Sequence, residues 1–71
     1  SQGELDLFTL RDGKRIGYEF KYTERPKVTP SLRKAINLLK LDEVHVVYPG
    51  KESFALAPGI TALGLASSPT P

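Results

Sequence analysis

The sequence contains no cysteine and only one histidine, His45, among its 71 residues. Without cysteine, the chain can form neither a disulfide framework nor a thiolate metal site. A single histidine also excludes a zinc site built from several imidazoles within the chain. Any metal site must therefore use oxygen ligands, which suit magnesium, manganese or calcium.

Other features missing from the sequence exclude further classes of protein. No apolar run approaches the ~20 residues that a membrane-spanning helix needs, and nothing resembles a signal peptide. We therefore expect a cytoplasmic protein with no membrane partner. The motif G-x-x-x-x-G-K-[ST] is missing, so this chain is not itself a P-loop ATP hydrolase. The net charge of +2 is too small to indicate nucleic-acid binding on its own.

The composition, 39% apolar in 71 residues, is enough for one modest core. We expect residues 1–66 to form a single α/β domain. The segment 67–71 is rich in serine and proline, and we expect a disordered tail or linker there. Because the chain starts at Ser1 rather than at methionine, directly before a predicted strand, we expect it to be a fragment of a longer polypeptide.

Alternating apolar and polar residues predict strands at 4–11 and 15–22. Asp12 and Gly13 lie between them, and an Asp-Gly pair is typical of a tight hairpin turn because glycine tolerates a positive φ. This turn sets the register. It places three pairs on one apolar face: Leu5 with Phe20, Leu7 with Tyr18, and Thr9 with Ile16.

A helix is predicted after the second strand, with Thr29 as its N-cap and Pro30 at the first helical position. Its apolar stripe is expected at Leu32, Ala35, Ile36 and Leu39. Three more strands are expected at 43–48, 53–57 and 60–65.

The expected order is β-β-α-β-β-β, an α/β fold with a small mixed sheet and one crossover helix. The helix makes the second and third strands parallel, with a right-handed connection. One helix leaves much of the sheet uncovered, which indicates missing sequence or a partner, including a second copy of the chain in a homodimer.

The hairpin register has a consequence for its acidic residues. Asp6 is expected opposite Glu19, and Glu4 opposite Lys21, on the polar face. Two carboxylates ~5 Å apart repel each other by roughly 1–3 kcal/mol. Lys21, a proton or a divalent cation should neutralise the pair. The alternative is an ordinary Glu4–Lys21 ion pair, with Asp6 bridging to Arg15 or to solvent.

The segment Glu19-Phe20-Lys21, with Asp6 on the adjacent strand, resembles the motif of the PD-(D/E)XK, or restriction-endonuclease-like, superfamily. The stretches "GELDLF", "DGKRIGYEFKY", "VTPSLRKAINLLKLDEVHVVYPG" and "ITALGL" resemble the C-terminal domain of a large prokaryotic family of AAA-type ATPases. That domain has no assigned function and is itself restriction-endonuclease-like. The chain departs from the superfamily pattern in lacking the usual first helix and in having Leu5 where the motif has proline.

The resemblance implies Asp6 and Glu19 as ligands of Mg²⁺ or Mn²⁺, Lys21 as the cation that contacts substrate or water, and Glu4 as an auxiliary acid. The implied activity is that of a nuclease-like domain, a metal-dependent phosphodiesterase that binds nucleic acid. Two alternatives remain open. One is a docking or regulatory domain that contacts a protein partner or its own ATPase module, and the other is a domain that binds nucleic acid without cutting it.

Three further groups of residues bear on the function. His45 is expected to project away from Val44 and Val46 as a partly buried strand histidine rather than as a catalytic base. The aromatic residues of the second strand are predicted to belong to the core: Tyr18, Phe20 and Tyr22. Five cations are expected around the hairpin loops, where they either meet phosphates or form a solvated rim: Arg11, Lys14, Arg15, Arg25 and Lys27.

Overall fold

A computed structural model describes residues 5–67, so Glu4 and the end of the predicted tail, 68–71, lie outside the described residues. The elements follow the predicted order. They are β1 (Leu7–Arg11), β2 (Lys14–Phe20), α1 (Pro30–Leu39), β3 (Glu43–Tyr48), β4 (Phe54–Ala57), β5 (Ile60–Gly64) and a short 3₁₀ helix, η1 (Leu65–Ser67). No helix within residues 5–67 is long and apolar enough to cross a membrane.

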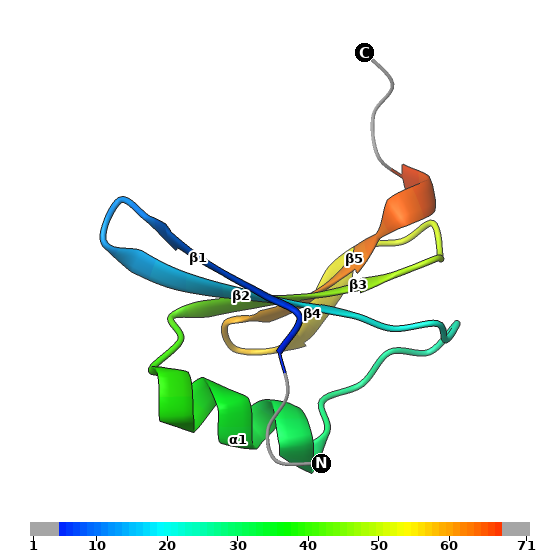
Figure 1. Ribbon diagram of the computed structural model, residues 1–71. Helices are drawn as coiled ribbons and strands as arrows, with labels where there is room; N and C mark the ends of the chain where they lie inside the picture. The colour runs from blue at the N-terminus through cyan, green and yellow to red at the C-terminus, as the bar shows by residue number, and fades with distance from the viewer. Residues whose placement is uncertain (1–4, 68–71) are drawn as a thin grey trace.

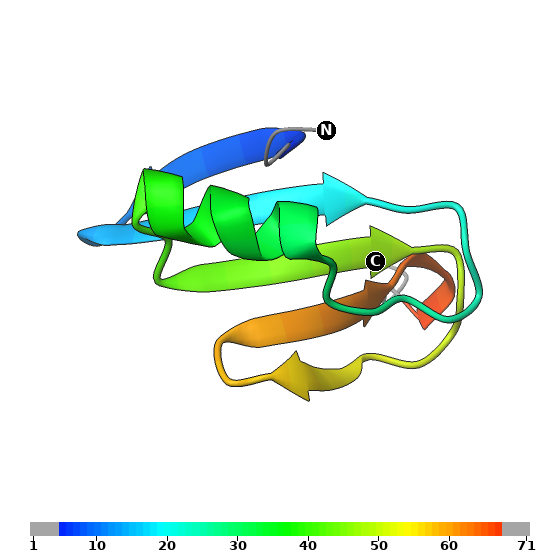
Figure 2. The same cartoon turned by 90° about the horizontal axis from the view of Figure 1, so that it is seen from below.

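The strands form one mixed sheet in the order β1-β2-β3-β5-β4. The three inner strands, β2, β3 and β5, are mutually parallel, whereas the edge strands β1 and β4 are antiparallel to their neighbours. The predicted crossover between β2 and β3 is confirmed, with α1 on one side of the sheet (Figures 1 and 2). The carboxyl ends of the inner strands therefore meet at one edge.

The hairpin between β1 and β2 has the predicted turn. Asp12 and Gly13 both have positive φ, 51° and 79°, as a type I′ turn requires. The ladder runs from Arg11–Lys14 to Leu7–Tyr18, which confirms the predicted register over the length of β1.

The N-terminal end of this hairpin differs from the prediction. The chain bends at Asp6, so β1 begins at Leu7, and Leu5 packs with the core on the helix side instead of lining up with Leu7 and Phe20. Gly17 makes room for it: an added Cβ there would lie 2.9 Å from Leu5 Cδ2. The packing of Leu5 against the core therefore outweighs the regular alternation of side chains between the two faces of the strand.

The helix begins as predicted. Thr29 caps it by accepting a hydrogen bond from the Leu32 N–H at 3.1 Å, and Pro30 occupies the first helical position. Leu32 and Ala35 are buried, and they hold the helix against the sheet. At the other end Lys40 adopts the left-handed conformation, φ 55° and ψ 50°, and its N–H bonds to the Ile36 carbonyl.

The core lies between this helix and one face of the sheet. Its central residues are Leu32, Val44, Val46 and Ile60. The opposite face of the sheet has no α-helix over it in the described chain, only the short η1 at one end (Figure 1). The prediction that the second-strand aromatics are core is therefore wrong for two of them: Phe20 is 54% exposed and Tyr22 fully exposed, while Tyr18 is half-buried and stacks on His45.

Candidate functional site

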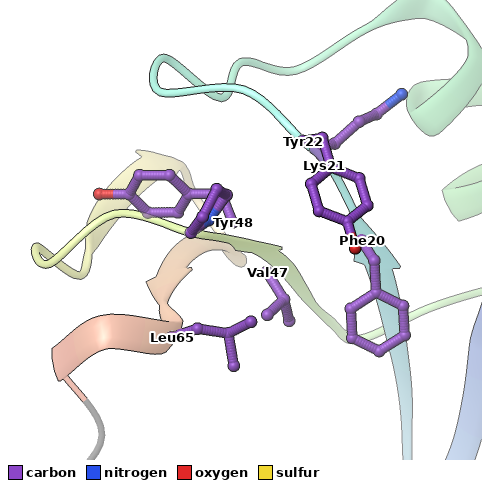
Figure 3. Close-up of a pocket in the computed structure, with 7 residues that line it drawn as sticks. Phe20, Lys21, Tyr22, Val47, Tyr48 and Leu65 are labelled. Carbon is purple, nitrogen blue, oxygen red and sulfur yellow. The ribbon is translucent and has the colours of Figure 1, made fainter.

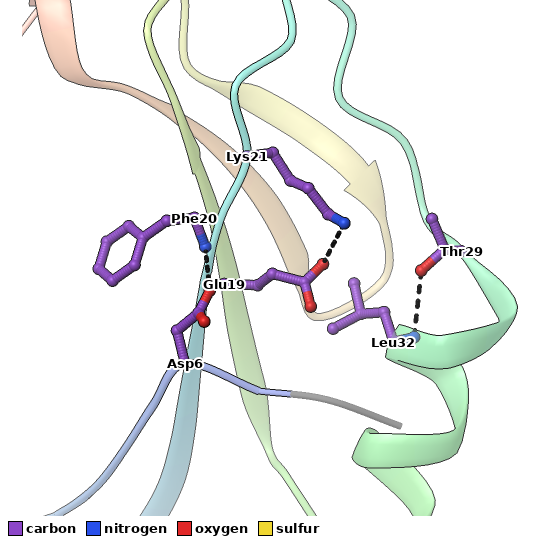
Figure 4. A network of polar contacts seen from close by, with 6 residues as sticks. All are labelled: Asp6, Glu19, Phe20, Lys21, Thr29 and Leu32. Atoms are coloured by element: carbon purple, nitrogen blue, oxygen red, sulfur yellow. Dashed lines mark hydrogen bonds and ion pairs between the residues drawn. The ribbon is translucent and has the colours of Figure 1, made fainter. Parts of the chain in front are cut away.

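The candidate site lies at the carboxyl end of β2. Glu19 is paired with Val46 in the parallel ladder, so its side chain lies on the face that α1 covers. It is only 6% exposed, and its Oε2 lies 3.6 Å from Lys21 Nζ (Figure 4). Lys21 is held in place by its own N–H, which donates to the Val47 carbonyl at 2.9 Å.

Because Glu19 is buried, its ionised carboxylate depends on the ion pair with Lys21 for stabilisation. An ionised carboxylate removed from water is costly unless a charged or hydrogen-bonding partner compensates it. Lys21 is the partner, and with 43% of its side chain exposed it keeps contact with solvent. Lys21 thus neutralises Glu19 while remaining able to reach a ligand. Lys21 is one of the three agents expected to neutralise the acids, and it contacts Glu19.

Asp6 has a different partner. Its Oδ2 accepts a hydrogen bond from the Phe20 N–H at 2.7 Å, at a point beyond the end of β1 where that N–H has no strand neighbour (Figure 4). Strand pairing starts at Leu7, so the predicted Asp6–Glu19 cross-strand pair is not part of the ladder. The two carboxylates contact different groups on β2, the backbone for Asp6 and Lys21 for Glu19. The predicted pairing of Glu4 with Lys21 lies outside the described residues.

The donor set can be tested against a divalent cation. Among residues 5–67 there is no group of three or more histidine, cysteine or acidic side chains that could hold a metal ion. Asp6 and Glu19 each use one carboxylate oxygen in the contacts above, Oδ2 and Oε2 respectively. Magnesium commonly takes one or two carboxylates and fills its remaining positions with water and phosphate oxygens. The described acids therefore do not form a closed protein cage, and a cation on them would need further ligands from water and a phosphate.

A basic cavity adjoins the Glu19–Lys21 pair. It measures about 150 Å³ and opens in the loop between β2 and α1. Its lining residues are Lys21, Thr23, Arg25, Pro26, Lys27 and Thr29. Three of these six side chains are cationic, so the cavity favours an anion.

A second cavity, of about 160 Å³, lies beside the same strand end and is mostly apolar (Figure 3). Phe20, Tyr22, Val47, Tyr48 and Leu65 contribute its carbon surface, together with Lys21 and Pro49. Lys21 is shared by the two cavities.

The five cations expected around the hairpin do not form one group. Arg11, Lys14 and Arg15 lie at the turn, at the opposite end of β2 from Arg25 and Lys27. Arg15 has a structural role there, since its Nε donates to the Leu39 carbonyl at 2.7 Å and its guanidinium lies 4.9 Å from the centre of the Phe8 ring. Only the second group is placed near the candidate carboxylates.

His45 lies on the other face of the sheet. It is paired with Tyr18 in the ladder and stacks on that ring at 5.2 Å, and its Nε2 donates to Glu43 Oε2 at 2.9 Å. The prediction that it projects away from Val44 and Val46 is confirmed. The sheet therefore separates it from the Glu19 carboxylate.

Comparison with known proteins gives two relatives without an assigned activity. One is an uncharacterized protein of Mycobacterium tuberculosis and the other an uncharacterized protein of Mycobacterium bovis, each 37% identical to this chain over 60 residues. The match covers 84% of this chain but only 14% of each relative. No family model and no solved structure matches the chain.

Proposed function

We propose that this chain is a restriction-endonuclease-like domain, of the kind found at the C-terminus of AAA-type ATPases, that binds nucleic acid together with Mg²⁺ or Mn²⁺. The observation that supports it most directly is the buried Glu19 carboxylate 3.6 Å from Lys21 at the carboxyl end of a parallel strand. Ligand sites of open α/β sheets are typically found at this edge. The mycobacterial relatives extend far beyond the matched 60 residues, as expected for proteins that contain such a domain beside others.

In this proposal Asp6 and Glu19 supply the protein oxygens for the cation, with Glu4 as an auxiliary acid. The cation would polarise a phosphoryl oxygen and activate a water molecule for phosphodiester hydrolysis. Once Glu19 is neutralised by a metal ion, Lys21 is no longer needed as its counter-ion. Its exposed ammonium group is then free to stabilise negative charge on the phosphate.

Metal binding is tested by titrating the chain with Mn²⁺ and recording amide NMR spectra. We expect selective paramagnetic broadening around Asp6 and Glu19. Asp6→Asn keeps an oxygen that accepts the Phe20 N–H, so it should fold normally and lose the broadening near residue 6. Asp6→Ala removes the acceptor as well and should lower the free energy of unfolding by about 1–2 kcal/mol. Unselective broadening across the chain would refute the metal site.

Hydrolysis is tested with labelled DNA and RNA oligonucleotides in the presence of Mg²⁺ or Mn²⁺. We expect cleavage that Lys21→Ala abolishes and that His45→Ala leaves intact, because His45 lies on the other face of the sheet. Glu19→Gln keeps the shape of the side chain and should abolish cleavage without unfolding the domain. Cleavage by both the Lys21→Ala variant and the Glu19→Gln variant would show that these two residues do not carry out the reaction.

The second candidate is a non-catalytic docking domain that contacts the ATPase module of a longer protein. The observation that favours it is the sheet face opposite α1, where Leu7, Phe20 and Leu63 are 37–54% exposed. An exposed apolar patch of this kind marks an interaction surface. This candidate predicts no selective Mn²⁺ broadening at Asp6 and Glu19, which distinguishes it from the nuclease-like domain.

A further inference from the structure

We propose that the loop between β2 and α1 forms a binding subsite for a phosphodiester of the nucleic-acid backbone, with Lys21, Arg25 and Lys27 as its cations. The subsite rests on the proposed function and adds to it the residues that hold the polymer. It is the cavity of about 150 Å³ described above. An enclosed cavity of ~150 Å³ can hold a benzene molecule, so the space is sufficient for a phosphate group.

Two of the three cations in this cavity have no acidic partner among the described residues. Within residues 5–67 the ion pair of a lysine or arginine with an acid is Lys21–Glu19, so Arg25 and Lys27 have no acidic partner in that part of the chain. Two unpaired cations beside a third, partly shared one create a local positive potential. A polyanion is the ligand that this potential attracts most strongly.

The cavity also contains hydroxyl donors. Thr23 Oγ1 accepts a hydrogen bond from the Arg25 N–H at 3.2 Å, and Thr29 Oγ1 accepts one from the Leu32 N–H at 3.1 Å. A hydroxyl that accepts through its lone pair retains its own hydrogen for donation. The two backbone contacts fix the positions of these oxygens, so both O–H groups can donate to a phosphate without rearrangement of the loop.

The loop is held in shape by the residue between its cations. Pro26 is buried, which anchors the segment to the domain, and its ring restricts Arg25 to extended backbone conformations. Arg25 therefore leaves the backbone from a restricted position, and Lys27 follows the anchored residue directly. Such preorganisation lowers the entropic cost of binding.

The position of the cavity connects it to the candidate hydrolytic residues. Lys21 lines the cavity and also contacts the Glu19 carboxylate. A phosphate in the cavity is thus one side chain away from Glu19, one of the two proposed metal ligands. We assign the cavity to the phosphate next to the one that is cleaved, so that it positions the strand rather than reacting with it.

The test compares two double variants that remove the same charge. Arg25→Ala/Lys27→Ala removes the two unpaired cations of the cavity, and Arg11→Ala/Lys14→Ala removes two exposed cations at the other end of β2. Binding of fluorescent single-stranded and duplex oligonucleotides is measured by anisotropy in EDTA at several salt concentrations. EDTA removes the metal contribution, so that only the cationic contacts are compared.

We expect the cavity variant to bind about tenfold or more weakly at low salt, and the turn variant to bind like the unmodified chain. Each lost phosphate contact should reduce the slope of log K against log salt by ~0.7 for single strands and ~0.9 for duplex. Two contacts therefore predict a reduction of about 1.4–1.8. Inorganic phosphate should also shift the amide signals of Thr23, Lys27 and Thr29 in the unmodified chain and not in the cavity variant.

Three outcomes would overturn the subsite. Equal affinities and slopes for the two variants would remove it while leaving the proposed function standing. Phosphate-induced shifts without oligonucleotide binding would show a site for a small anion and not for a polymer. No oligonucleotide binding by the unmodified chain in EDTA would overturn the subsite, whereas the metal-dependent function is tested separately by the Mn²⁺ titration and the cleavage assay.

Discussion

At the scale of single residues, the two acids selected from the sequence have clear structural contacts. Asp6 completes the hydrogen bonding of β2 by accepting the Phe20 N–H, and Glu19 is a buried carboxylate compensated by Lys21. Neither contact prevents a carboxylate from binding a cation through its second oxygen. Structural and ligand-binding roles can therefore coexist in both residues, and the Asp6→Asn and Asp6→Ala variants separate them.

Gly64 supports a prediction about stability. A Cβ at this position would lie 2.7 Å from the carbonyl oxygens of both Glu52 and Gly50, and these backbone atoms cannot move away independently. We expect Gly64→Ala to lower the free energy of unfolding by about 1–3 kcal/mol in urea denaturation. Gly17→Ala is the matched control, since the atoms that its Cβ would meet are the ends of the Leu5 and Leu41 side chains.

Because leucine side chains can change rotamer, Gly17→Ala should cost clearly less than Gly64→Ala. The reverse ranking would show that the backbone of residues 50–52 adjusts more readily than the core under α1.

At the scale of elements, the end of α1 offers a stabilising change. Lys40 adopts a left-handed conformation, which costs a residue with a Cβ about 1–2 kcal/mol and costs glycine almost nothing. We therefore expect Lys40→Gly to raise the free energy of unfolding by about 1 kcal/mol. The same substitution inside the helix, Lys34→Gly, should lower it by about 1 kcal/mol. Thermal unfolding of both variants is the measurement, and a loss of stability in Lys40→Gly would contradict the role of the C-cap.

The elements were largely predictable because each has a local signal. The Asp12-Gly13 pair fixed the register from Leu7 to Arg11, and the Thr29-Pro30 pair located the start of the helix. The bend at Asp6 was not predictable from the sequence. The carboxylate there accepts the Phe20 N–H, and such a hydrogen bond does not change the spacing of the apolar residues from which strands are predicted.

The site was predictable only in part, for a geometric reason. Arg25 and Lys27 follow the hairpin closely in sequence, but β2 carries the chain ~20 Å from the turn before the loop begins. Proximity in sequence therefore grouped them wrongly with Arg11 and Lys14. The proposed ligand roles of Thr23 and Thr29 have no sequence signal, because a threonine that caps a helix or turn gives no separate signal for a ligand. The available signal was the segment 23–30, with two cations and two prolines shortly after Lys21.

At the scale of the whole molecule, one face of the sheet is packed and the other is open. Leu63 and Leu65 are 37% and 59% exposed on or beside the open side, near Phe20 and Val47. We expect the isolated chain to self-associate through this surface, as a homodimer, with a concentration dependence measurable by sedimentation velocity. Leu65→Lys should reduce the association because it places a charge in the apolar contact.

Leu38→Lys is the control for this prediction, since Leu38 is 67% exposed but lies on the helix. It should leave the association unchanged. An equal effect of the two substitutions, or a monomer at every concentration of the unmodified chain, would contradict association through the open face.

The alternation of side chains along β2 links the two sides of the molecule. Phe20 contributes to the open surface, while its neighbours Glu19 and Lys21 face the helix and the basic loop. A protein that immobilised Phe20 would also steady the backbone from which the carboxylate and the ammonium group project. Attachment of the domain to a larger assembly and its proposed affinity for phosphate would then be thermodynamically coupled through three consecutive residues.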